Sequence, residues 1–123
     1  MEINEKIKDG KKVTIIIKKE IDITNFSYEA FLNLPEYSLS LECDQFDYEG
    51  MNFTFIDPED GKEHKLDRNK IEIGMEKFLN QCIEGKHGEY LSDLLNLFDL
   101  GYWDATVMDN CIQICLFNEI VFG

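Results

Sequence analysis

The segment from Glu42 to Gly50 holds the densest set of side chains that could do chemistry. It contains four acidic and two aromatic residues: Glu42, Asp44, Asp47, Glu49, Phe46 and Tyr48. On a β-strand, residues i and i+2 point to one face about 6.7 Å apart, so their carboxylates form a row that a turn can continue. Basic nucleic-acid grooves receive the same features, which are spaced negative charge and flat rings. The segment therefore predicts a surface that binds a basic protein partner; the alternative is a solvated acidic loop.

The charges around this segment are unevenly distributed. Residues 1–19 carry a local charge of +3, whereas residues 20–61 contain eleven acids and no lysine or arginine. Residues 87–123 also lack lysine and arginine and contain six acids. An ordinary solvated surface mixes both signs, and these stretches do not. We therefore extend the predicted partner-binding surface to three further acids of the first stretch: Asp57, Glu59 and Asp60.

Dense carboxylates can also attract a divalent cation, because hard cations take several carboxylate oxygens. The EF-hand spacing is absent at residues 42–50 and at residues 57–63. No spacing of cysteines and histidines matches a zinc site. We predict no metal site and no cofactor.

Cysteine chemistry is the other option that the sequence leaves open. A nucleophilic pair could be assembled from His87 and either Cys82 or Cys115, since such partners meet in space rather than in sequence. Every cysteine, however, lies in an apolar pattern, where a free thiol behaves as a small hydrophobe. We predict that the protein is not an enzyme and has no catalytic residues; a small cysteine-dependent enzyme is the alternative.

The composition is that of one globular domain, residues 1–123, with residues 1–12 as a candidate flexible basic segment. Apolar residues make up 44% of the chain, and this length can bury a core without disulfides. A net charge of −13 repels nucleic acid phosphates and anionic lipids, so we expect no direct binding of nucleic acid or membranes. The chain lacks a signal-peptide pattern and a long apolar run, which predicts a cytoplasmic protein with reduced thiols.

The first half of the chain has the alternation that is typical of strands. We predict strands at residues 13–24, 37–44, 52–56 and 62–66, the last two joined by a turn with Pro58 and Gly61. In the second of these strands Leu39, Leu41 and Cys43 are expected to point inward. Between the first two strands, Ser27 is predicted to cap a short helix that Pro35 ends.

After Leu66 the period changes to that of helices. The first predicted helix has an apolar face from Ile71 to Ile83, with a capping box at Asn69 and Glu72 and a stop at Gly85. The second spans Leu91 to Phe98. The third begins after Asp104, runs toward Phe122 and is apolar on most of its circumference, with a thin polar stripe of Asp109, Asn110 and Gln113. This order predicts an α+β fold, in which an antiparallel sheet of about four strands is followed by about three helices packed on one face.

The end of the third helix leaves two questions. Asn118 and Glu119 lie on the predicted buried side, so either the helix ends near Phe117 or Glu119 meets a partner. Leu116, Phe117 and Ile120 lie near the polar stripe and form an apolar strip. We expect this strip either to form a homodimer interface or to be covered by the N-terminal strand with its lysines.

The closing segment, Thr106 to Gly123, resembles the end of uncharacterised phage and mobile-element proteins that finish in a phrase like F-G-E-I-V-Y-G. The likeness covers this helix alone, with Asn118 in place of the glycine and Phe122 in place of the tyrosine. As a small acidic domain without an active site, the chain also resembles anti-defence inhibitors of the anti-CRISPR type from phages. The immunity proteins that neutralise bacterial toxins are a second such group.

These resemblances imply an inhibitor. We expect an acidic protein that blocks the basic nucleic-acid-binding surface of a bacterial defence protein, as a nucleic-acid mimic does. The alternative is an immunity protein that neutralises a basic toxin such as a nuclease. In either case aromatic anchors supply much of the binding energy, and Phe46, Tyr48 and Tyr102 are the expected anchors.

Overall fold

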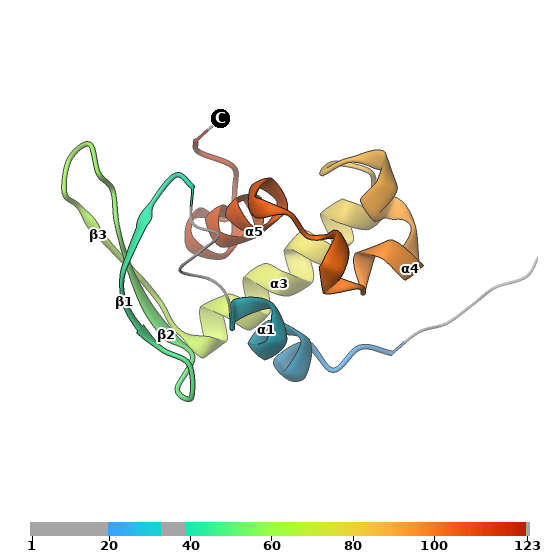
Figure 1. The fold of residues 1–123 in the computed structure, drawn as a ribbon, viewed down its shortest axis with the longest axis horizontal. Helices are drawn as coiled ribbons and strands as arrows, with labels where there is room; N and C mark the ends of the chain where they lie inside the picture. The colour runs from blue at the N-terminus through green and yellow to red at the C-terminus, as the bar shows by residue number, and fades with distance from the viewer. Residues whose placement is uncertain (1–19, 33–38, 123) are drawn as a thin grey trace, which may run out of the picture.

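A computed structural model describes residues 20–32 and 39–122 of the chain (Figure 1). Its elements are α1 (Ile23–Phe31), β1 (Glu42–Asp47), β2 (Asn52–Ile56), β3 (Glu63–Leu66), α3 (Arg68–Ile83), the 3-10 helix η1 (Glu89–Ser92), α4 (Leu94–Leu97), the 3-10 helix η2 (Leu100–Tyr102) and α5 (Ala105–Phe117). The sheet lies at one end, α3 runs away from it between α1 and α5, and α4 lies at the far end (Figure 1). The predicted α+β class is confirmed.

The described sheet has three antiparallel strands in the order β1-β2-β3. The predicted hairpin of β2 and β3 is confirmed: Asp57 pairs with Lys62 across the turn, and Gly61 adopts the left-handed φ of 73° that such a turn needs. Phe53, Phe55 and Leu66 point from the sheet into the core. The sheet thus has one face covered by helices and one open face.

Close contact of α3 with α5 makes the centre of the core. At Gly74 a Cβ atom would lie 2.4 Å from the Cα of Cys115, so only glycine fits at this crossing. Around it pack Phe31, Met75, Phe78 and Ile112, all of them buried. No helix within residues 20–32 and 39–122 is long and apolar enough to cross a bilayer.

The element order differs from the prediction at the N-terminal side. The predicted strand 13–24 is wrong in its last residues, because α1 begins at Ile23, where the Asp22 carboxylate accepts a hydrogen bond from the Asn25 N–H. Ser27 is therefore inside the helix rather than its cap. The rest of that strand and Pro35 lie outside the described residues. One α-helix thus precedes the sheet, and residues 20–32 and 39–122 form three strands and four α-helices, where the prediction for the whole chain was about four strands and three helices.

The strand predicted at residues 37–44 begins later, at Glu42. Leu39, predicted to point inward, is 60% exposed. The backbone N–H groups of Leu39 and Ser40 donate to the Asp109 carboxylate on α5, so they cannot join a strand ladder. Residues 37 and 38 lie outside the described part of the chain.

Two of the helix predictions need correction. The cap of α3 is Asp67, which accepts from the Lys70 N–H, so the predicted capping box of Asn69 and Glu72 is wrong. The helix predicted from Leu91 to Phe98 is divided into η1, α4 and η2, and Leu95 is 81% exposed. Asp93 and Asp99 each accept a backbone N–H two residues on, which ends the preceding segment.

The last helix begins after Asp104 as predicted. It ends at Phe117, where Asn118 takes a left-handed φ of 64°, so the first of the two predicted endings is confirmed. The predicted polar stripe is wrong, because Asp109 and Gln113 are buried. Leu116 and Phe117 are half-buried, with Phe117 edge-on to His64, and Ile120 is exposed.

Candidate protein-binding surface

Six of the nine predicted partner-binding residues lie on the strand β1 or in the turn that follows it, and β1 is at one edge of the described sheet. We name the exposed side chains along it the acidic edge: Glu42, Asp44, Phe46, Asp47 and Glu49. Glu42 pairs with Ile56 at one end of the strand, and Asp47 pairs with Asn52 at the other. Negative charge therefore extends along the whole strand.

A β-bulge interrupts this strand and changes which side chains share a face. The register shifts between Cys43 and Gln45, so Asp44 has no residue directly opposite. Glu42, Gln45 and Asp47 oppose the outward residues of β2, and Phe46 opposes the inward Phe53. The carboxylates thus do not form the single row that strict alternation predicts, because the extra residue turns Phe46 to the core side.

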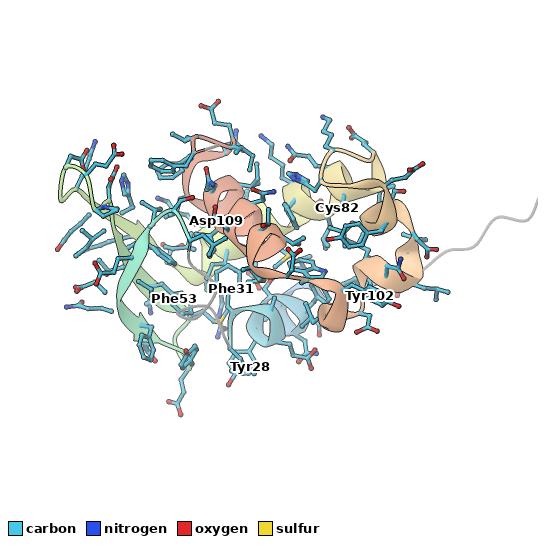
Figure 2. All side chains as sticks on the ribbon, turned by 45° about the horizontal axis from the view of Figure 1, so that its top comes forward. Tyr28, Phe31, Phe53, Cys82, Tyr102 and Asp109 are labelled. Carbon is cyan, nitrogen blue, oxygen red and sulfur yellow. The ribbon has the colours of Figure 1, made fainter. Side chains whose placement is uncertain are left out.

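Phe46 is the exposed end of an aromatic stack that begins in the core. Phe46 is 52% exposed, and its ring centroid lies 5.0 Å from that of Tyr48. The Tyr48 ring in turn lies edge-on to Phe53, with 6.0 Å between the ring centroids. The ring centroids of Phe53 and of the fully buried Phe31 of α1 are 5.5 Å apart. Both residues are labelled in Figure 2. The stack fixes Phe46 on a rigid support, which lowers the entropy lost on binding.

The acids of the second turn are separated from those of the first. The two turns lie at opposite ends of the sheet (Figure 1), and β2, five residues long, spans about 17 Å between them. Asp57 is 9% exposed and accepts the Glu59 N–H at 2.9 Å, and Asp60 accepts the Lys62 N–H at 2.8 Å. Asp57 therefore shapes the turn, and Glu59 and Asp60 are exposed beside the Glu42 end of β1.

The open face of the sheet carries both signs of charge. A hollow of about 540 Å³ lies on it, lined by residues that include Asp47, Asp67, Lys65 and Lys70. The two lysines come from β3, at the opposite edge of the sheet from β1, and from α3, and they line the same hollow as Phe46 and Asp47 of β1. The negative surface is thus the edge along β1 rather than the whole face. Lys65 follows residues 20–61, the stretch without lysine or arginine, so the sequence already indicated where the negative surface ends.

The thiols of Cys43, Cys82 and Cys111 are in surroundings that oppose ionisation. Burial raises the pKa of Cys82 to about 12, and burial and the nearby Asp44 raise the pKa of Cys43 to about 11. Burial also raises the pKa of Cys111, with its hydrogen-bonded neighbour Cys115 adding to the effect. A nucleophilic cysteine needs the opposite shift, so these positions do not favour the cysteine-enzyme alternative.

The histidines also have structural contacts. His87 Nε2 is 2.8 Å from Gln81 Oε1 and its ring packs on Phe78, while the His64 ring lies against Phe117. Burial, with Lys86 nearby, lowers the pKa of His87. Among the residues that the structure describes, no three side chains of His, Cys, Asp or Glu converge as metal ligands would.

The sequence analysis did not identify Asp109 and Gln113 as a buried structural pair. Asp109 and Gln113 were assigned to solvent, yet together they bond the chain near Ser40 and the chain near Phe122 to α5 (Figure 2 labels Asp109). Tyr102 was also an expected anchor. It is exposed among the helices at the end of the molecule away from the sheet, so it does not share a surface with Phe46 on β1 (Figures 1 and 2).

Comparison with known proteins gives no family for this chain. No protein-family model matches it, and neither a curated protein nor a solved structure shows significant similarity to it. The geometry of the acidic edge is therefore the basis for assigning a function.

Proposed function

We propose that this protein is an inhibitor that binds the basic nucleic-acid-binding surface of a bacterial defence protein through its acidic edge. One observation carries the proposal: an exposed aromatic ring, Phe46, is held by a stack that begins in the core, and the stretch of chain that carries it bears acids and no lysine or arginine. Four carboxylates along β1 and its turn belong to this edge: Glu42, Asp44, Asp47 and Glu49.

The two components of the edge have different roles in this proposal. Carboxylates that face a basic groove accelerate encounter and fix the orientation of the complex, and this effect weakens as salt screens the charges. A rigid, exposed ring supplies binding energy when it enters a pocket or stacks under an arginine. Phe46 is placed for this second role, with Asp47 and Glu49 close to it in the chain.

The test begins with capture of a partner and ends with competition. Tagged protein is cross-linked in the bacterium that carries its gene, nucleic acid is digested, and the captured protein is identified and purified. A fluorescent oligonucleotide is then bound to that protein, and its displacement is followed by polarisation. We expect the wild-type chain to displace the oligonucleotide at low ionic strength and less well at high ionic strength.

Two matched triple variants locate the contact. Phe46→Ala with Asp47→Asn and Glu49→Gln removes one exposed apolar side chain and two charges from the acidic edge. Leu95→Ala with Glu76→Gln and Glu89→Gln removes the same from other exposed positions. We expect the first variant to compete at least about tenfold less well, because an aromatic anchor that becomes buried in the complex contributes more than about 1.4 kcal/mol. We expect the control to compete as the wild type does.

Equal competition by both variants would overturn the assignment of the edge. Affinity that does not change with salt would overturn the electrostatic mechanism. A captured partner that is a toxic nuclease, from which the chain protects living cells, would place the same surface in an immunity protein.

A further inference from the structure

A cavity of about 300 Å³ lies between the N-terminal halves of α1 and α3. The buried Met51 of the β1–β2 turn contributes to its lining, and Tyr28, labelled in Figure 2, is one of its exposed residues. It is separate from the hollow on the open face of the sheet, with which it shares no residue. The acidic edge contributes no side chain to it.

Ser27 lines this cavity and has an unusual hydroxyl. The residue is 0% exposed, and its Oγ is the one buried side-chain polar atom without a hydrogen-bond partner in the described part of the chain. Leaving a buried hydroxyl unpaired is unfavourable, and nearly all buried polar groups in proteins are paired. An unpaired hydroxyl at a cavity wall therefore points to a ligand that completes it.

Charged groups of both signs line the same cavity. Asp22 and Glu72 supply two carboxylates and Arg68 supplies a guanidinium. Each already makes one contact that fixes its position: Asp22 Oδ1 accepts the Asn25 N–H at 3.1 Å, Glu72 Oε1 accepts the Thr24 hydroxyl, and Arg68 Nη2 donates to the Glu49 carbonyl at 3.3 Å. A carboxylate has a second oxygen and a guanidinium has five N–H donors, so each group can also bind a ligand.

We propose that this cavity binds a small zwitterion with the chemistry of an α-amino acid. Its ammonium group lies between the carboxylates of Asp22 and Glu72, and its carboxylate lies against Arg68 and accepts the Ser27 hydroxyl. A purely cationic ligand would face Arg68, and a purely anionic ligand would face two carboxylates, whereas a zwitterion pairs with both signs. The cavity is at the small end of the range for ligand sites, which fits a compact molecule.

The test compares three probes that differ by one charged group. L-serine carries both charges, ethanolamine lacks its carboxylate, and 3-hydroxypropionate lacks its ammonium. Binding is followed by ¹H–¹⁵N correlation spectra of the full chain at millimolar probe. We expect L-serine to shift resonances of α1 and of the first turns of α3 in a saturable manner, and the two analogues to bind about tenfold more weakly, because each loses a charge-assisted hydrogen bond.

Variants separate binding from folding. Ser27→Ala removes the unpaired hydroxyl, so the free protein is expected to melt at the same or a higher temperature while its affinity for L-serine falls several-fold. Arg68→Gln is expected to weaken L-serine but not ethanolamine, and Lys62→Gln, an exposed cation outside the cavity, is the control that leaves both unchanged. Ethanolamine that binds as tightly as L-serine, or L-serine that shifts no resonance near the cavity, would overturn the proposal.

Discussion

The Asp109 carboxylate accepts a hydrogen bond from the side-chain amide of Gln113 at 2.9 Å, one turn apart on α5 and both buried. Asp109 also accepts from the backbone N–H groups of Leu39 and Ser40 and from the Ser40 hydroxyl. Gln113 accepts from the N–H groups of Val121 and Phe122 and donates to the Phe122 carbonyl. Two adjacent side chains thus attach two distant segments to one helix.

Replacing Asp109 with alanine should strongly destabilise the protein. The change leaves the buried Gln113 amide and the part-buried donors of Leu39 and Ser40 without their acceptor, and an unpaired buried donor costs about 1–3 kcal/mol. We expect the free energy of unfolding to fall by about 3 kcal/mol, measured by urea unfolding. Glu119→Ala, at an exposed acid beyond the same helix, is the control and should change it by less than about 0.5 kcal/mol. Similar losses in both variants would show that the hydrogen bonds of Asp109 are not the cause.

Gln113→Ala should release the C-terminal segment. The side-chain oxygen of Gln113 holds the N–H groups of Val121 and Phe122 at 2.8 and 2.7 Å. Without that acceptor these amides lose protection, so hydrogen exchange at residues 121 and 122 should accelerate while the amides in the middle of α3 remain protected. Unchanged exchange at the two amides would contradict this role of Gln113.

Local signals in the sequence were enough for several elements. The hairpin of β2 and β3 was predictable because Gly61 supplies the left-handed residue that the turn requires. The start of α5 was predictable because the Asp104 side chain accepts the Val107 N–H three residues on. Each of these interactions lies within a few residues of the chain, where spacing alone reveals it.

What the sequence did not reveal depends on distant partners. Asp109 and Gln113 are polar and lie one helical turn apart, which is typical of a solvated stripe. They can be buried because Asp109 hydrogen-bonds to Ser40, 69 residues away, and Gln113 to Phe122, 9 residues away. The bulge at Asp44 is likewise set by the pairing of β1 with β2, and it turns Phe46 to the core side of the sheet. The sequence thus shows where the acids lie along the chain, but it did not show that the sheet separates them at its two ends.

Gly74→Ala should weaken the crossing of α3 and α5. The added methyl would lie 2.4 Å from the Cα of Cys115, and a backbone atom cannot move aside as a flexible side chain can. Overpacking of this kind typically costs about 1–3 kcal/mol, here toward the upper end. Gly85→Ala, whose φ of 84° is strained for alanine but whose surroundings are open, should cost about 1 kcal/mol. Thermal unfolding ranks the two; the reverse order would contradict the tight crossing.

The buried thiol of Cys82 should resist both ionisation and alkylation. Its pKa is about 12 in the folded state, above the unfolded value of about 8.5. The unfolded state therefore loses its proton first, and the stabilisation is complete below pH 8.5 and declines as pH rises toward 12. Stability should fall between pH 8 and pH 10, and less so in Cys82→Ala. Iodoacetamide at pH 8 should label Cys82 far more slowly in the native state than in urea, and fast native labelling would revive the cysteine-enzyme alternative.

The aromatic stack that supports Phe46 should show graded costs from the surface to the core. Phe46 is half exposed, so Phe46→Ala should lower the free energy of unfolding by less than about 1 kcal/mol. Phe53 is buried, and Phe53→Ala should lower it by about 3–5 kcal/mol, because it leaves a cavity beside Phe31. Urea unfolding of both variants measures the difference. A Phe46→Ala variant as unstable as Phe53→Ala would mean that the Phe46 ring belongs to the core. A ring that contributes little to folding yet is held in place by a buried stack is free to contribute its energy to a partner instead.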